Sequence, residues 1–473
     1  MIPVSDKFKE IMSSRLRPKA EPKITLSGKD ADGNDVVIEW TSHDISDFTY
    51  KRGIDPVGRT LPYMSLTWKE IYTGKLGKGN SAIKYNNVVP YMKVKLEIKQ
   101  NLTFWNFWRG FIGRTWKDLF STTWKDIMKK PISETVELPD MYLVAKPVVE
   151  GQSITWEARD FFYFLNNQQR IGFQKGINYR NPLRWVLLDE RATFKDNDDF
   201  IRSLDETQKG IITDEEGNTS WLTVFDDSTK NILKDYASAR SYFWSFTGNK
   251  AKMTPLSEIT NSKDIVFGFT ADLMKSYPKI TENSNVSAYS FSQTFVKADT
   301  ENEYVIDTPD ETIAVYGQIE VNRFIFDDWG YIKPSESAFS PTVISKEGYS
   351  SGGQSSGDSV TVVPVSVTTT EIFMNNNKQG EVFSESNKYN FEGEASQSNI
   401  LRFGLLDKYF NKKCNVLSFE CTPNFFVEPM DFVSVETNMY DGENKIVKSG
   451  VIVEQELKYK GSFVQKNIIH EVV

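Results

Sequence analysis

The chain has 473 residues and a mass of 54.2 kDa, a length at which two or more domains are expected because a single hydrophobic core stops growing. Its 39% hydrophobic and 25% charged residues exclude global disorder. The 56 basic and 64 acidic residues give a net charge of −8, which excludes a general attraction to nucleic acids, and the 13% of aromatic residues favours β-sheets and large interfaces.

We expect residues 1–165 to form a first, β-rich domain. Segments 23–28 and 36–40 flank a turn-rich run of Asp, Gly and Asn and predict a hairpin. Residues 91–99 alternate between apolar and mostly charged side chains, which is typical of a strand with one solvent-exposed face. Two further segments with strand character follow, at 141–147 and 153–159.

Residues 101–130 interrupt this β pattern. Aromatic and aliphatic side chains recur there at helical spacing, and Pro131 ends the run. The segment contains six basic and two acidic residues, a net charge of +4, within a chain of net charge −8. The pattern predicts an amphipathic helix inserted between strands.

The remaining chain divides into three predicted regions. Residues 166–262 form a mixed α+β region, in which a helix carrying Ile232, Leu233, Tyr236 and Ala237 on one face precedes a hairpin. Residues 263–413 are β-rich and contain a Gly/Ser stretch at 350–358, and residues 414–473 form a C-terminal β-barrel module. The predicted fold class is therefore mainly β with an α+β middle: two β-barrel-like modules flank a helix-plus-hairpin region.

Few residues are suited to catalysis. The two histidines, His43 and His470, lie near opposite ends of the chain, so a serine triad is not indicated. The Ser81–Lys84 spacing lacks its companion motifs, and acidic pairs such as Asp327 and Asp328 are typical of turns. Cys414 and Cys421 are interpreted as reduced core thiols. We expect no catalytic site, no metal site and no cofactor.

Several stretches resemble one protein family in the same order along the chain. Residues 44–68 are similar to the early strand, turn and following strand of tail hub (baseplate hub) proteins of long-tailed bacteriophages and prophages of Gram-positive hosts. Residues 141–160 resemble the end of that family's first barrel, and residues 232–256 resemble its helix-hairpin module. Residues 428–436 and 457–461 are similar to its last barrel.

The resemblance implies a structural virion protein without enzymatic activity. Such a protein forms a homotrimeric hub at the distal end of the tail, contacts the tail tube, the tape-measure protein and the tail-tip or spike proteins, and gates the passage of DNA without binding it specifically. The N-terminal residues lack the apolar core of a signal peptide, so we expect assembly in the host cytoplasm. Two alternatives stay open: a tail-tip enzyme that degrades capsule or cell wall, and a receptor-binding adaptor.

The inserted segment 101–130 is the predicted docking site. We interpret it as docking on a neighbouring subunit or tail protein, and a second interpretation is contact with the host membrane through Trp rings and cations. The candidate docking residues are Trp105, Trp108, Trp116, Phe120, Trp124, Lys117 and Lys125.

Overall fold

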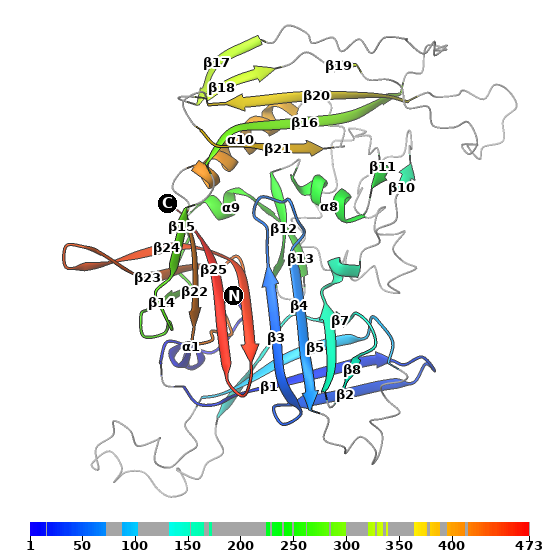
Figure 1. Cartoon of the computed structure of the whole chain (residues 1–473), viewed down its shortest axis with the longest axis vertical. Helices are drawn as coiled ribbons and strands as arrows, with labels where there is room; N and C mark the ends of the chain where they lie inside the picture. The colour runs from blue at the N-terminus through cyan, green and yellow to red at the C-terminus, as the bar shows by residue number, and fades with distance from the viewer. Residues whose placement is uncertain are drawn as a thin grey trace, which may run out of the picture.

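The computed structural model places most of both terminal regions and parts of the middle of the chain (Figure 1). The residues that it describes are 1–15, 17–71, 88–102, 132–151, 153–164, 170–172, 224–227, 229–238, 241–247, 250–261, 263–282, 285–298, 320–326, 329–333, 337–338, 364–375, 379–387, 395–411 and 415–472.

One large sheet contains the strands of both terminal regions. Its central order is β15-β22-β25-β24-β3-β4-β9-β7-β5-β1-β2, with β6, β8, β14 and β23 attached at the side. The strands are β1 (Ala20–Lys29), β2 (Asp35–Thr41), β3 (Ile45–Gly53), β4 (Tyr63–Ile71), β5 (Lys93–Asn101), β6 (Ser133–Glu137), β7 (Met141–Leu143), β8 (Val148–Glu150), β9 (Ser153–Arg159), β14 (Phe267–Phe269), β15 (Lys279–Glu282), β22 (Asn415–Cys421), β23 (Phe432–Asp441), β24 (Asn444–Tyr459) and β25 (Phe463–Glu471).

The mainly β fold is confirmed, but the terminal modules are not closed barrels. Strand β3 pairs antiparallel with β24, from Phe48 opposite Tyr459 to Gly53 opposite Glu454, so the two modules share one sheet. The strand order ends at β15 and β2, which have no further neighbour among the described residues. The expected barrels are therefore corrected to a continuous open sheet, because the edge strand of each module is completed by the other module.

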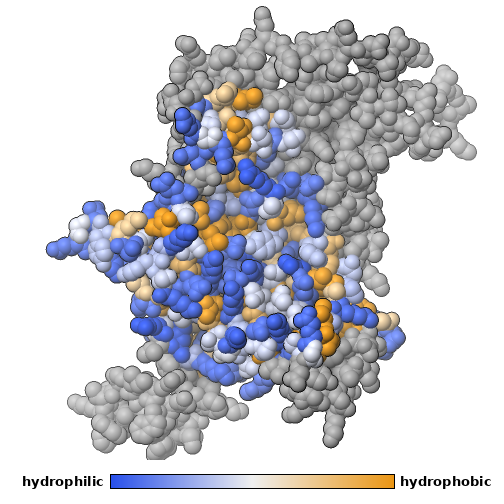
Figure 2. Space-filling view, viewed as in Figure 1, coloured by the Kyte–Doolittle hydropathy of each residue, from blue (hydrophilic) through white to orange (hydrophobic). Residues whose placement is uncertain are grey.

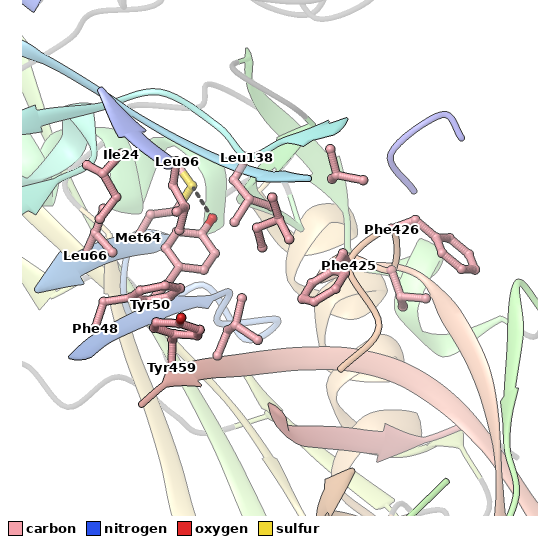
Figure 3. Packing of buried hydrophobic residues seen from close by; sticks show 14 of the residues in the cluster. Ile24, Phe48, Tyr50, Met64, Leu66, Leu96, Leu138, Phe425, Phe426 and Tyr459 are labelled. Carbon is pink, nitrogen blue, oxygen red and sulfur yellow. Dashed lines mark hydrogen bonds between the residues drawn. The ribbon is translucent and has the colours of Figure 1, made fainter. Parts of the chain in front are cut away.

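The first hydrophobic core lies along this sheet. Figure 3 shows Phe48 and Tyr50 of β3 beside Tyr459 of β24, and the Phe48 and Tyr459 rings stack with centroids 5.5 Å apart. The hydroxyl of Tyr50 donates to the sulfur of Met64 on β4 at 3.7 Å. Three buried indoles, Trp40, Trp68 and Trp156, pack with ring centroids 4.9 to 5.7 Å apart. The core thus joins residues from both ends of the chain.

Helix α1 (Asp6–Met12) closes part of this core. Ser5 caps it by accepting a hydrogen bond from the backbone N–H of Phe8 at 3.2 Å, as expected of an N-terminal serine. Phe8 and Met12, one turn apart on the same face, are fully buried. The backbone N–H of Ile2 donates to the carbonyl of Phe426 at 2.8 Å, which ties the N-terminus to the C-terminal module.

The middle of the chain contains the predicted helix and hairpin. Helix α8 (Thr229–Ser238) precedes the hairpin of β12 (Tyr242–Thr247) and β13 (Lys250–Pro255), and helix α9 (Ser257–Thr260) follows. Leu233 and Ala237 are buried as expected, and the indole N–H of Trp244 donates to the carbonyl of Leu233 at 2.9 Å. Short strands β10 (Arg170–Gly172) and β11 (Val224–Asp227) pair beside this unit, and a 3-10 turn, η3 (Phe161–Phe164), follows β9.

A second sheet lies at the top of Figure 1 with a helix against one face. Its strands are β16 (Val286–Ala298), β17 (Glu320–Phe326), β18 (Trp329–Lys333), β19 (Ser337–Ala338), β20 (Pro364–Met374) and β21 (Glu381–Asn387). Helix α10 (Ala395–Asn411), which the β-rich reading of this region did not predict, stacks Phe403 on Phe373 with centroids 4.5 Å apart. Phe403 and Leu406 are fully buried there.

Candidate functional site

A buried ion pair joins the N-terminal and C-terminal modules. The guanidinium of Arg52, on β3, donates from Nη1 to Oε1 of Glu428 at 3.0 Å and from Nη2 to the carbonyl of Val427 at 2.7 Å. Its Nε donates to Oε1 of Gln455, on β24, at 2.9 Å. Arg52 and Glu428 are each only 6% exposed. Such a pair is stable inside a protein only when its remaining hydrogen bonds are also made.

A chain of amide side chains continues from this pair across the C-terminal strands. The amide of Gln455 donates to Oδ1 of Asn467 at 3.1 Å, and the amide of Gln465 donates to the same oxygen at 2.8 Å. Asn467 in turn donates to the sulfur of Cys421 at 3.2 Å. Burial raises the pKa of the Cys421 thiol to about 12, so this cysteine stays a neutral thiol. Its burial agrees with the core position expected for it.

Two further charges lie beside Glu428. The ammonium of Met1 is 3.2 Å from Glu428 and 2.9 Å from Asp431. The backbone N–H of Glu428 donates to the carboxylate of Asp431 at 2.8 Å. Burial raises the pKa of the Asp431 carboxyl, and the Met1 ammonium limits this rise. We call the set Arg52, Glu428, Gln455, Asp431 and Met1 the junction.

The turn between β3 and β4 makes a second contact, with helix α10 on the second sheet. Asp55 holds this turn by accepting hydrogen bonds from the backbone N–H groups of Val57 at 3.0 Å and Thr60 at 2.9 Å. Arg402 of α10, which pairs with Glu385, donates from Nη2 to the carbonyl of Val57 at 2.8 Å. Residues 44–68, which contain Arg52, therefore contact both the C-terminal module and helix α10 on the second sheet.

Gly58 in this turn has a positive φ of +77°, a conformation that favours glycine. A Cβ added there would lie 3.4 Å from the carbonyl oxygen of Tyr242. The turn thus lies in van der Waals contact with the helix-hairpin unit, and the positive φ is what would strain a larger residue there.

Asp160 ends the first module. Its carboxylate accepts hydrogen bonds from the backbone N–H of Met64 at 2.6 Å and of Tyr163 at 3.3 Å, and its burial raises its pKa to about 6. The folded protein therefore binds a proton at Asp160 more readily than the unfolded chain does. This carboxyl alone makes the fold more stable as the pH falls from about 6 towards 4.

The structure does not bring the two histidines together. His43 is exposed in the turn before β3, whose N-terminal half pairs with the Tyr459 end of β24. His470 lies in β25 opposite Val451, eight residues back along β24. His470 shares a hydrogen bond with the hydroxyl of Tyr409 on α10, and burial lowers its pKa to about 4. His470 is therefore neutral and, through Tyr409, helps to pack α10 against the C-terminal strands.

Most other residues singled out in the sequence lie outside the described part of the chain. These are the docking candidates Trp105, Trp108, Trp116, Phe120, Trp124, Lys117 and Lys125, together with Ser81, Lys84, Asp327, Asp328, Cys414 and the Gly/Ser stretch 350–358. The docking prediction for residues 101–130 stays a prediction. The described residues at its ends meet, because the backbone N–H of Leu102 donates to the carbonyl of Ile132 at 2.7 Å.

The described residues offer little for ligand chemistry. They contain no cluster of His, Cys, Asp or Glu that could hold a metal ion. No helix among them is long and apolar enough to cross a membrane. A hollow beside Arg52, lined by Tyr63, Phe246 and Pro429, encloses about 10 Å³, which is room for about one water molecule.

Arg52 belongs to none of the motifs found in the sequence, although it lies in the stretch 44–68. Every second residue of β3 from Phe48 is buried, namely Phe48, Tyr50 and Arg52. This alternation was the signal in the sequence that could have marked Arg52 as buried. The pattern places an arginine where a core residue is expected, which indicates a buried partner. It does not indicate that the partner is Glu428, at the other end of the chain.

The β23–β24 hairpin projects from the body as an arm, which we define as residues 437–448. Figure 1 shows the arm at the left, beyond the end of its neighbour β14. Met439, Tyr440 and Val447 on the arm are 44%, 58% and 56% exposed, and hydrophobic residues mark the same projection in Figure 2. Exposed apolar side chains on a projecting two-stranded ribbon are typical of an interaction surface.

No protein-family model matches the chain, and no curated protein does. Several solved structures are similar to it over most of its length. The 43 kDa tail protein of prophage MuSo2 from Shewanella oneidensis is 10% identical, with 95% of this chain and 98% of that chain covered and a TM-score of 0.43.

The tail protein from Neisseria meningitidis MC58 is 5% identical, with 95% and 96% covered and a TM-score of 0.44. Prophage tail protein gp18 from Listeria monocytogenes EGD-e is 9% identical, with 95% and 94% covered and a TM-score of 0.39. At this level of similarity no residue of the present chain acquires a role from these structures.

Proposed function

We propose that the chain is a structural protein of a bacteriophage tail, and that it forms the hub at the distal end of the tail. One observation carries this proposal. Residues 44–68 and 428–436, two of the stretches that resemble tail hub proteins, meet through the Arg52–Glu428 ion pair of the junction. The resemblance thus concerns one connected unit and not two scattered fragments.

The physical properties of this unit suit a component that must stay folded under mechanical force. Strand β3 continues the sheet of the C-terminal module by main-chain pairing with β24, and the buried junction fixes the register of the two modules. A unit tied together at both ends of its chain resists local unfolding when force passes through it. The sheet also keeps open edges at β15 and β2 among the described residues, and open edges are available for contacts between subunits.

The proposed hub is a homotrimer that joins the tail tube to the tail-tip or spike proteins and lets DNA pass. We propose that it carries no catalytic site; His43 and His470 lie at different positions along the strands of the sheet. The net charge of −8 opposes non-specific binding of the passing DNA.

Tail particles purified from a host that carries the gene test this proposal. Mass spectrometry is expected to find the protein in the particles, and deletion of the gene is expected to stop tail assembly, with restoration by the wild-type gene. A tape-measure gene directly upstream supports the same assignment. Normal infectious particles from the deletion strain contradict it.

A hydrolysis assay on host cell-wall and capsule preparations separates the hub from a tail-tip enzyme. The purified protein is expected to release no product. Product release that is lost when Asp327→Asn is introduced into a folded protein contradicts the structural role and favours the enzyme. Saturable binding to isolated host envelopes, in the absence of tail incorporation, favours a receptor-binding adaptor.

A further inference from the structure

The arm has free main-chain edges. Strand β23 pairs with β14 only from Val433 to Val435, so the arm part of β23 pairs only with β24 among the described residues. Strand β24 pairs with β25 from Gly450 onward, and the backbone N–H of Val472 donates to the carbonyl of Ser449. Residues 444–448 of β24 are therefore open on the side that β25 occupies further along, and an open strand edge is a template for another strand.

Strand β2 offers a second open edge. It is the last strand of the large sheet and pairs only with β1 among the described residues. Val37 on its outer face is 56% exposed, and Glu39 on the same face is also exposed. Figure 1 shows β2 in the lower part of the molecule, away from the arm at the left. The arm of one chain therefore does not reach β2 of the same chain.

The two edges match in one register. When β2 runs antiparallel to β24 with Lys445 opposite Glu39, Val447 falls opposite Val37 and Ile446 falls opposite Ile38. The first two pairs lie on one face of the two strands, and the third lies on the opposite face, because side chains alternate along a strand. Cross-strand pairs of opposite charge and of β-branched residues are the ones that stabilise sheets.

Other registers lose this match. A shift by one residue places Lys445 on the half-buried face of β2, opposite Ile38 or Trp40. A shift by two residues in one direction places Glu443 opposite Glu39, and in the other direction places Val447 opposite Glu39. Among these registers, only the one with Lys445 opposite Glu39 keeps both the charge pair and the valine pair.

We infer that the arm of one copy of this chain adds as a strand to the free edge of β2 of a second copy. The contact uses a different surface on each partner, so it is heterologous and closes into a ring when the rotation between copies allows. Lys445 already pairs with Glu436, and Glu39 lies 2.7 Å from Lys23. The new ion pair therefore sets the register, while main-chain hydrogen bonds and the valine and isoleucine pairs supply the affinity.

The inference rests on the proposed function only in that a hub must contact its own copies. Its test uses the purified full chain and no phage, so it can fail while the tail assignment stands. Incorporation into particles can likewise fail while the contact between copies is observed.

Cysteine crosslinking tests the register. Val37→Cys and Val447→Cys are made in separate chains, which are mixed in equal amounts and oxidised, because directly opposed residues have Cβ atoms about 5 Å apart. A disulfide-linked dimer is expected in the mixture and not with either variant alone or with the parent chain, which keeps Cys414 and Cys421. Thr41→Cys mixed with Val447→Cys is the matched control, because Thr41 lies four residues from Val37, about 13 Å along the strand. No dimer in the first mixture, or equal dimer from one variant alone, overturns the inference.

A charge exchange tests the Lys445–Glu39 pair without crosslinking. Lys445→Glu or Glu39→Lys is expected to weaken self-association about five-fold or more in analytical ultracentrifugation, because like charges then face each other. Combining both changes in one chain is expected to restore it. Circular dichroism and thermal melting of each variant check that the chain is folded. Self-association that is unchanged in both folded single variants, or weakened in both and not restored in the double variant, overturns the inference.

Discussion

Replacing Arg52 by alanine tests the junction most directly. The substitution leaves the carboxylate of Glu428, the carbonyl of Val427 and the side-chain oxygen of Gln455 without the donors that now lie 2.7 to 3.0 Å away. Removing one partner of a buried ion pair costs about 3–5 kcal/mol when the other charge is left uncompensated. The Met1 ammonium stays 3.2 Å from Glu428, so the expected cost lies at the lower end, about 3 kcal/mol. That is a large part of the roughly 5–15 kcal/mol by which a typical domain is stable.

Lys51 is the matched control because it is the next residue on β3 and faces solvent. Its ammonium lies 3.0 Å from Glu456, and its side chain is 43% exposed. Exposed pairs contribute about 0–1 kcal/mol, so Lys51→Ala is expected to change stability little. The two alanine variants thus differ mainly in whether the lost charge was buried.

Urea unfolding followed by tryptophan fluorescence is the assay, because Trp40, Trp68 and Trp156 are buried in the same sheet. A double-mutant cycle with Arg52→Met and Glu428→Gln is expected to give a coupling of about 1–3 kcal/mol. If Arg52→Ala costs no more than Lys51→Ala, the ion pair does not hold the modules together and the junction argument is refuted.

Three further outcomes are expected. Gly450→Ala places a Cβ 2.1 Å from the backbone oxygen of His470 and should lower the free energy of unfolding, measured by thermal melting, by about 3 kcal/mol or more. Gly442→Ala is the control at the open tip of the arm, where φ is +63°, and should cost only about 1 kcal/mol. Equal costs would contradict the close packing at Gly450. Burial lowers the pKa of His470 from 6.5 to about 4, so its contribution to stability is complete above pH 6.5, and up to about 3 kcal/mol is lost as the pH falls towards 4. His470→Gln should remove this loss, which urea titrations across that pH range measure. An unchanged dependence of stability on pH in the variant would contradict this role of His470. Replacing the segment between Leu102 and Ile132 by an Asn-Gly turn should leave the melting temperature of the protein nearly unchanged, because these two residues already share a backbone hydrogen bond. The same replacement should block tail assembly. Loss of folding would refute the first expectation, and normal infectious particles would refute the second.

Local patterns in the sequence correctly predicted the elements whose signal lies in adjacent residues. The two segments around the turn at 30–35 form β1 and β2, with Ile24 opposite Trp40. The alternating residues 91–99 correspond to β5, and Val94, Leu96 and Ile98 are fully buried. Strand β5 begins only at Lys93, since Tyr91 has a positive φ of 71°. These predictions succeeded because a period of two and turn chemistry are written in adjacent residues.

The helix α10 shows where the same reasoning failed. Its 17 residues begin with a polar stretch and include Gly404, so neither capping nor propensity marks it strongly. The helix is stabilised instead by packing Phe403 against Phe373 of β20 and Leu406 into the same core. That packing depends on a sheet formed by other parts of the chain, and tertiary contacts outweigh local preference.

Adjacent residues were enough to predict the β character of the two terminal regions, the helix-hairpin unit and the family resemblance of separate stretches. The pairing of β3 with β24 and the contact of Arg52 with Glu428 appear only in the folded chain. Main-chain pairing is the same for every strand, so an open edge does not specify which distant strand will complete it. The choice between two closed barrels and one shared sheet was therefore made by long-range packing, in which the buried charges of Arg52 and Glu428 require each other.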